Sequence, residues 1–171
     1  MRARRPFNGV VPVFSYMTIL LAAGSAVHAP APPVSAARAA LSACSLVSQA
    51  DVRQAFGRAV AAGVESRDGE QSSCDYDGGN GQVTITVRRL AAPIDLQVEI
   101  AALQRSIPEG RVRAAGGMGP AAFFLDIPGA GAQLYVVRGG AFVMVSALGF
   151  GEAARVSDAA AALARKALAG L

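Results

Sequence analysis

The feature that most constrains the possible folds of this chain is a pair of apolar runs separated by two glycines. Residues 133–138 and 141–147 are rich in β-branched and aromatic residues, and Gly139 and Gly140 between them suit a two-residue hairpin turn. Both runs carry apolar side chains at consecutive positions, so neither has a purely polar face. Strands of this kind are central in a sheet, or they lie under a helix and a partner. The pair therefore predicts an antiparallel hairpin in a covered position.

Further strands are expected on both sides of that hairpin. Residues 82–89 alternate strictly between apolar and polar side chains, which is typical of a strand half buried against a core. Residues 74–76 are expected to pair with them across a glycine-rich turn, and residues 121–127 precede the covered hairpin. Residues 111–115 are expected to add another strand, whereas the polar segment 63–72 is expected to be a loop.

Three helices are expected to pack on this sheet. The first begins at Ser48, whose hydroxyl can accept from the amide of Asp51, and it ends at Gly57. The second runs over residues 93–107, where apolar residues recur every three or four positions, and the third over residues 151–169. The predicted fold class is α+β: a two-layer fold whose mostly antiparallel sheet of about five to six strands is packed by two or three helices.

Residues 1–29 are expected to be a signal peptide. Arg2, Arg4 and Arg5 precede an uncharged apolar run, and small residues lead to Ala29, the predicted site of signal cleavage. The alternative is a retained membrane anchor, because the apolar run is nearly as long as the helix of about 20 residues that is needed to span a bilayer. We expect an exported protein, periplasmic or extracellular, that meets the membrane only transiently through this segment.

The charge of the chain is nearly balanced once that segment is removed. The whole sequence has 16 Lys+Arg and 12 Asp+Glu, net +4, and loss of the three leader arginines leaves 13 against 12, net +1. The remaining basic pairs are Arg88-Arg89 and Arg165-Lys166. A nucleic-acid-binding domain needs a clustered basic face, so we expect no nucleic-acid partner.

Cys44 and Cys74 are the two cysteines of the chain. Two cysteines in an exported domain usually pair, and we expect a disulfide between them. The alternative is lipidation of Cys44, because residues 41–44 match a lipobox, although prolines and an arginine separate them from the apolar run. Residues 30–43, rich in Ala and Pro, are expected to be a flexible linker, and residues 44–171 a single α+β domain.

Residue types that carry catalysis are sparse. His28, the single histidine, precedes the predicted cleavage site, which removes Ser-His-Asp, Cys-His and histidine metal sites from the mature chain. A Walker A motif is absent from the sequence, and residues 117–119 are expected to be a strand connection that needs positive φ rather than a cofactor loop. We predict no cofactor, no metal and no enzyme activity. Paired carboxylates among Asp75, Asp77 and Asp126 are the remaining enzymatic alternative.

A set of short motifs spans Cys44 to about Leu168. It comprises Ala43-Cys44-Ser45-Leu46, Gln49-Ala50-Asp51-Val52, Phe56-Gly57, Cys74-Asp75-Tyr76, residues 117–124 and residues 134–140. This set resembles the motifs of a class of small bacterial exported proteins and lipoproteins of unknown function. The resemblance implies a PsbP-like α+β domain with a Cys44–Cys74 disulfide, and it implies no catalytic residue. Pro120 departs from that class, which often has Asp there.

Three functions remain open from the sequence. The apolar hairpin 133–147 favours a binding module that meets an unidentified protein or envelope component through the face of its sheet. A carrier of a small apolar ligand is the second hypothesis, and a carboxylate-only enzyme is the third. The pocket of the carrier would lie between the sheet and the second helix, lined by Leu96, Ile100, Leu103, Phe142 and Met144.

Overall fold

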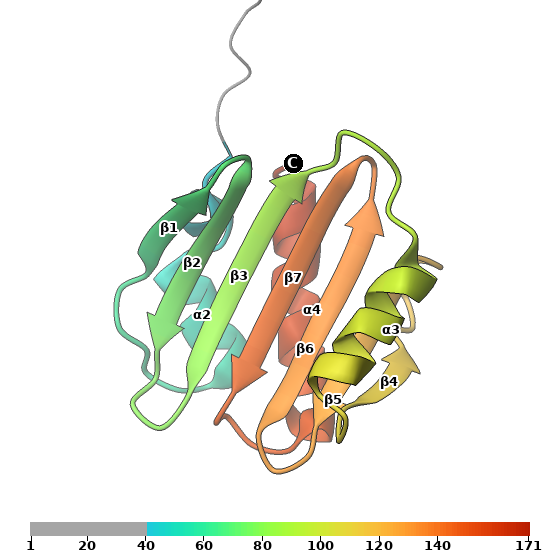
Figure 1. Ribbon diagram of the computed structural model, residues 1–171. Helices are drawn as coiled ribbons and strands as arrows, with labels where there is room; N and C mark the ends of the chain where they lie inside the picture. The colour runs from blue at the N-terminus through green and yellow to red at the C-terminus, as the bar shows by residue number, and fades with distance from the viewer. Residues whose placement is uncertain (1–40) are drawn as a thin grey trace, which may run out of the picture. The chain divides into compact units, whose positions relative to one another are not determined.

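Seven strands form one antiparallel sheet in the computed structural model, which describes residues 41–171 (Figure 1). Their order across the sheet is β1-β2-β3-β7-β6-β5-β4, so that the last strand of the chain lies at the centre. The predicted signal peptide, its cleavage site at Ala29 and most of the predicted linker lie outside the described residues. The strands are β1 (Val64–Asp68), β2 (Gln71–Asp77), β3 (Gln82–Arg89), β4 (Arg111–Ala114), β5 (Ala122–Ile127), β6 (Gly131–Arg138) and β7 (Ala141–Leu148).

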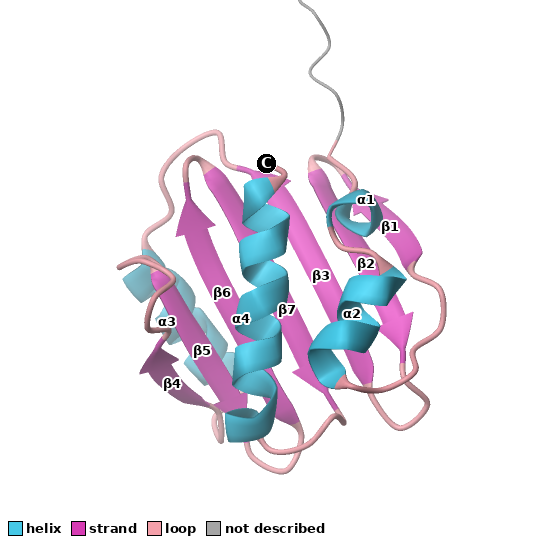
Figure 2. Cartoon of the chain, turned by 180° about the vertical axis from the view of Figure 1, so that it is seen from behind, coloured by secondary structure: helices cyan, strands magenta, loops and turns pink. Residues whose placement is uncertain are grey.

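Helices lie on both faces of this sheet. We call the face covered by α1, α2 and α4 the back face (Figure 2), and the face that carries α3 the front face (Figure 1). The α+β class and the antiparallel sheet are confirmed, but the described part of the chain has 7 strands and 4 helices, more than predicted. The two-layer description is also incomplete, because α3 adds a layer over β5 and β6. The helices are α1 (Ala43–Leu46), α2 (Gln49–Phe56), α3 (Leu96–Ser106) and α4 (Ala153–Ala169).

The main core lies under the back face. Its centre is built from cross-strand pairs of β3 and β7, such as Ile85 opposite Val145 and Val87 opposite Val143, all of them fully buried. Each such side chain stabilises the fold by about 1.5–3 kcal/mol relative to leaving it exposed. The predicted apolar stripe of α4 is confirmed, because its four members are buried: Val156, Ala160, Leu163 and Ala167.

The first predicted helix, α2, begins and ends where expected. The Ser48 hydroxyl accepts from the amide of Asp51, and the Asp51 carboxylate accepts from the amide of Ser48 at 2.8 Å, which makes a capping box. Gly57 ends the helix with φ of 62°, a left-handed conformation that glycine adopts without strain. Lys166 of α4 donates to Asp51 at 2.6 Å and ties the two helices together. Burial raises the pKa of the Asp51 carboxyl, but the hydrogen bonds from Lys166 and Ser48 outweigh burial and lower the pKa below 3.8.

A disulfide joins α1 to β2, as predicted. Cys44 and Cys74 are bonded, with Cα atoms 5.1 Å apart. The short helix α1 was not predicted, and it starts at Ala43, inside the expected linker 30–43. The amide of Ala43 donates to the hydroxyl of Ser72 at 2.9 Å, beside the disulfide. The helix is thus held to the sheet by one covalent bond and one buried hydrogen bond.

The segment predicted as a loop is part of the sheet. Residues 63–72 include all of β1 and the start of β2, joined by a turn at Gly69. All 5 residues of β1 are exposed, so this edge strand lacks the alternation by which a half-buried strand is identified. It is held by backbone pairing with β2. Glu65 and Arg67 place charge on this edge, which opposes pairing with another chain.

Two further connections refine the sequence expectations. α3 begins at Leu96 rather than at Pro93, because the carboxylate of Asp95 accepts hydrogen bonds from amides of the first turn. The link between β4 and β5 takes φ of 73° at Gly117 and 101° at Gly119. The prediction of a strand connection with positive φ is therefore confirmed.

Candidate functional site: the front face of the sheet

α3 covers only one end of the front face (Figure 1). Its apolar side packs in a cluster whose buried centre is Phe123, Leu125 and Tyr135 of β5 and β6. The rings of Phe123 and Tyr135 stack with their centroids 4.8 Å apart. Among residues 41–171, no helix lies over β2 and β3 on this face. The front face is therefore half covered.

The residues of the predicted apolar pocket meet in this cluster. All five pack against its centre and are half-buried, and no residue of α3 is fully buried. The helix is thus seated on the sheet without being enclosed by it. Binding of an apolar ligand at this place stays a prediction. The residues are Leu96, Ile100, Leu103, Phe142 and Met144.

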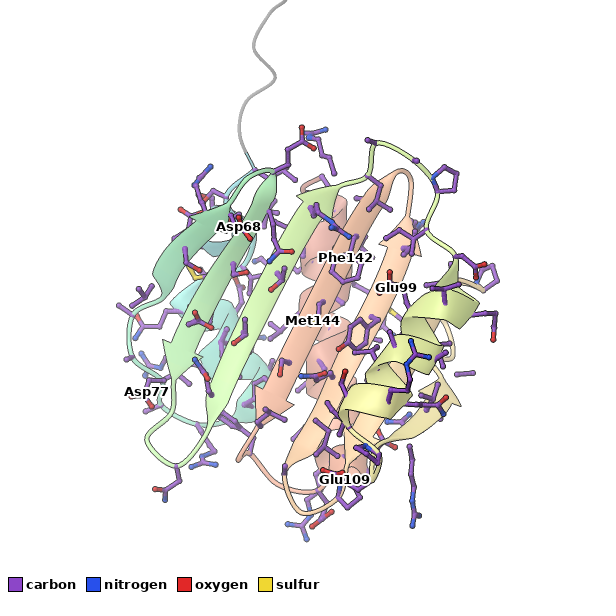
Figure 3. The ribbon with its side chains drawn as sticks, viewed as in Figure 1. Asp68, Asp77, Glu99, Glu109, Phe142 and Met144 are labelled. Atoms are coloured by element: carbon purple, nitrogen blue, oxygen red, sulfur yellow. A yellow bond between two sulfur atoms is a disulfide. The ribbon has the colours of Figure 1, made fainter. Side chains whose placement is uncertain are left out.

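A half-exposed surface remains beside α3. Phe142 and Met144 lie on β7 in the middle of the front face (Figure 3). On the neighbouring strand β3 they pair with Arg88 and with Thr86, which is buried, and Ser73 of β2 lies opposite Thr86. We call these five residues the front patch. It combines an apolar centre with one cation and two hydroxyl groups.

Polar side chains around the front patch bond to one another. Ser73 and Thr86 share a hydrogen bond of 2.9 Å, and Thr84 donates to Asp75 at 2.5 Å. On the other side of β7, the amide of Gln133 donates to Ser146 at 3.3 Å. Because these groups already have partners, the surface can be covered by another protein without leaving them unsatisfied.

Arg88 is the exception among these polar groups. Its guanidinium lies over the ring of Phe142, 5.4 Å from the centroid. Its Nε is buried and has no hydrogen-bond partner within residues 41–171. An unpaired buried donor costs about 1–3 kcal/mol, so an incoming acceptor here is favoured. The alternation of 82–89 placed Arg88 on the outer side of its strand, but its contact with Phe142 follows only from the register of β3 with β7.

Tyr135 forms the wall between the front patch and α3. Burial raises the pKa of its phenol to about 12, and the nearby Glu99 carboxylate adds to the effect. The neutral hydroxyl donates to Gln133 at 2.6 Å. Tyr135 is therefore protonated at neutral pH, and its ring forms part of the aromatic surface beside the front patch. Figure 3 places Glu99 on the side of α3 nearest the front patch.

The outer side of α3 carries an exposed valine, two alanines and one exposed arginine, Arg105. Val98 is 60% exposed, and it shares a side of the helix with Ala101 and Ala102, three and four positions later. This side is opposite the stripe that packs on the sheet. Within residues 41–171, the only other large hydrophobic side chain exposed to this degree is Val64, on the edge strand β1.

The carboxylates proposed as a catalytic pair do not all come together. Asp75 lies on the front face of β2, where it accepts from Thr84. Asp126 lies on β5, where Arg113 donates to it at 2.7 Å. Strands β3, β7 and β6 separate them. The residues that the structure describes hold no group of three or more possible metal ligands, and none of their helices is long and apolar enough to span a bilayer.

Comparison of the chain with protein-family models, with curated proteins and with solved structures gave no significant match. The assignment of this surface therefore rests on its own geometry.

Proposed function

We propose that this domain is an exported binding module without catalytic activity, and that its front patch docks α3 of a second copy. The observation that carries the proposal is the presence of two complementary surfaces on one chain. One is the half-exposed apolar centre of the front patch, Phe142 and Met144. The other is the outer side of α3 around Val98. Each surface is only partly covered within residues 41–171.

The size of the uncovered strip supports a helix as the occupant. β2, β3 and β7 lie in one sheet, and three strands at a spacing of about 4.8 Å occupy about 14 Å. A helix with its side chains is about 10–12 Å across. α3 already packs on the other half of the same face through its inner stripe. A second helix beside it would cover Phe142 and Met144.

Reciprocal docking accounts for both surfaces at once. In a two-fold dimer, each copy gives its α3 and receives that of the other, so the same contact is made twice. In this arrangement Glu99, at the margin of the docking side, would offer a carboxylate to Arg88 of the other copy, and Arg105 of the same side would have to lie away from Arg88. An aromatic residue, a methionine and an arginine are residue types enriched at protein interfaces.

The location outside the cytosol is part of the proposal. It is supported by the disulfide Cys44–Cys74, which persists in oxidising compartments. It is also supported by the arginine-led apolar segment before Ala29 and by the resemblance to small exported proteins. N-terminal sequencing of the exported protein is expected to begin at Pro30, whereas material that still starts at Met1 would contradict cleavage.

Sedimentation velocity over a range of concentrations tests the dimer. The unaltered protein is expected to dimerise reversibly, and Val98→Asp or Met144→Asp to weaken dimerisation by about tenfold or more, because each buries a charge. Val64→Asp is the matched control, since Val64 is 67% exposed but lies on β1. A protein that stays monomeric at every concentration would overturn the proposal, and so would equal effects of all three substitutions.

A charge exchange makes this test sharper. Arg88→Glu and Glu99→Arg are each expected to weaken self-association. In an equimolar mixture of the two variants, each docked helix would again meet an opposite charge, so a mixed dimer is expected to form. Absence of the mixed dimer, with both variants folded by circular dichroism, would exclude this pairing.

A carrier of a small apolar ligand is the second candidate. The observation that favours it is that α3 has no fully buried residue although its stripe packs on the sheet. A helix held in this way can move aside and admit an alkyl chain above Leu103 and Met144. Native mass spectrometry of the exported protein would detect such a ligand as added mass, and a mass equal to the bare chain would contradict the carrier.

A further inference from the structure

A second surface feature lies at the opposite face of the sheet, at the end where β3 and β6 finish. The register places Arg89 of β3 and Arg138 of β6 on either side of Ala141 of β7. Both arginines lie on the back face, because Val87 and Val136, two positions earlier in each strand, belong to the back core. The small side chain of Ala141 leaves a hollow between two long cationic ones.

The last turns of α4 pass over the back face of the sheet (Figure 2), and residues near their end line this hollow. Arg165 adds a third guanidinium, and Leu168 and Leu171 supply apolar walls. The turn Gly139–Gly140 forms the rim, and the cavity has a volume of about 400 Å³. Pockets for small molecules are about 300–1,000 Å³ in size. The hollow is therefore large enough for a charged head group with part of an attached chain.

The positive charge of this cavity is not neutralised within the fold. None of its three arginines forms an ion pair with a carboxylate of residues 41–171. The neighbouring Lys166 is engaged by Asp51 at 2.6 Å. The last carbonyl groups of α4 carry partial negative charge, which favours the position of Arg165 but amounts to only about half a unit charge. Three like charges around one hollow favour the entry of an anion, although water and salt screen the two exposed ones, Arg138 and Arg165.

We propose that this cavity binds an amphiphilic anion, a carboxylate or phosphate on an alkyl chain. Guanidinium groups hold such head groups through paired N–H donors, and three of them converge here. The alkyl chain would lie against Leu168 and Leu171. This site is on the opposite face from the front patch and does not depend on the proposed dimer.

Isothermal titration calorimetry tests the site with four probes: decanoate, decyl phosphate, decanol and inorganic phosphate. Both amphiphilic anions are expected to bind one per chain, more tightly than inorganic phosphate, whereas decanol is expected not to bind. A preference for decyl phosphate would indicate a phospholipid source, and a preference for decanoate a free fatty acid. Equal binding of decanol, or no binding of either anion, would overturn the proposal.

Substitutions of the lining arginines test whether the anions bind in this cavity. Arg138→Gln and Arg165→Gln together are expected to weaken binding of the anions by about tenfold or more, because each removes charged donors. Both residues are exposed, so the fold is expected to persist. Arg155→Gln, an exposed arginine earlier on α4, is the matched control. An equal loss in the control would mean that general charge, and not this cavity, attracts the probes.

Discussion

The hydroxyl of Tyr76 in β2 donates a hydrogen bond to the main-chain carbonyl of Val47, the first residue after α1. Both residues are buried, 1% and 0% exposed. The bond lies near the disulfide Cys44–Cys74, which joins the same helix pair to the same strand. Together with the bond from Ala43 to Ser72, this contact and the disulfide hold the N-terminal helices to the sheet.

Tyr76→Phe is expected to destabilise the domain by about 1–3 kcal/mol, because it leaves the buried carbonyl of Val47 without a donor. The free energy of unfolding in urea measures the effect. Tyr135→Phe is the control, since its partner Gln133 is half-buried and can be hydrated instead. The prediction fails if the two variants lose the same stability.

Loss of the disulfide is expected to cost about 3–4 kcal/mol, since the bond closes a loop between cysteines that are 30 positions apart. The variant that carries both Cys44→Ala and Cys74→Ala, and the unaltered protein under reducing conditions, are expected to unfold at similarly lowered urea concentrations. An unfolding midpoint that is unchanged by reductant would contradict this expectation.

Alkaline pH is expected to unfold the domain through its two buried tyrosines. Burial raises the pKa of Tyr76 and of Tyr135 from 10.0 to about 12; the carboxylates of Asp51 and Glu65 add to the shift at Tyr76. The folded state thus keeps these protons at pH values where the unfolded chain releases them. Their contribution to stability is complete below pH 10.0 and is lost as the pH rises to about 12.

Ultraviolet absorbance of tyrosinate, followed together with circular dichroism, checks the alkaline transition. Ionisation and unfolding are expected to coincide above pH 10.0. The double variant Tyr76→Phe, Tyr135→Phe is expected to lose this part of the pH dependence. Ionisation of both phenols near pH 10.0 with the fold intact would show that neither is buried as described.

Two neighbouring glycines are expected to differ sharply in their tolerance of alanine. Gly129 and Gly131 both have positive φ, 72° and 140°. A Cβ at Gly129 meets nothing within 4 Å, whereas one at Gly131 would collide with the carbonyl oxygen of Ala147. Gly129→Ala is expected to cost about 1 kcal/mol from backbone strain, and Gly131→Ala about 3 kcal/mol or more from strain and overpacking together. Thermal unfolding of the two variants compares them directly.

Elements with a clear apolar period could be predicted from the sequence, and those without one could not. The alternation of 82–89 and the hairpin 133–147 identified the three central strands, and the helix residues Val156 and Leu163 are buried as expected. β1 was missed because both of its faces are exposed. α1 was missed because 4 residues are too few to display a helical period.

The same limit applies to the two proposed sites. Phe142 and Met144 could be grouped with α3, because each element shows its own apolar side. The placement of Arg88 over Phe142 depends on how β3 and β7 align, and that of Arg89 beside Arg138 depends on β7 lying between their strands. Strand order depends on the whole chain, so a short segment of sequence does not show which strands are neighbours in the sheet.

The central position of β7 also determines the order in which the sheet can assemble during synthesis. A ribosome delivers β1, β2 and β3 together with both cysteines long before Ala141, the first residue of the strand that must pair with β3. Until then the nascent chain exposes the hydrophobic side of β3 and a strand edge without hydrogen-bond partners, although both cysteines of the disulfide are already present. A chain truncated before β7 would therefore be an aggregation-prone fragment with exposed hydrophobic surface. Fragments of this kind are substrates for chaperones and proteases.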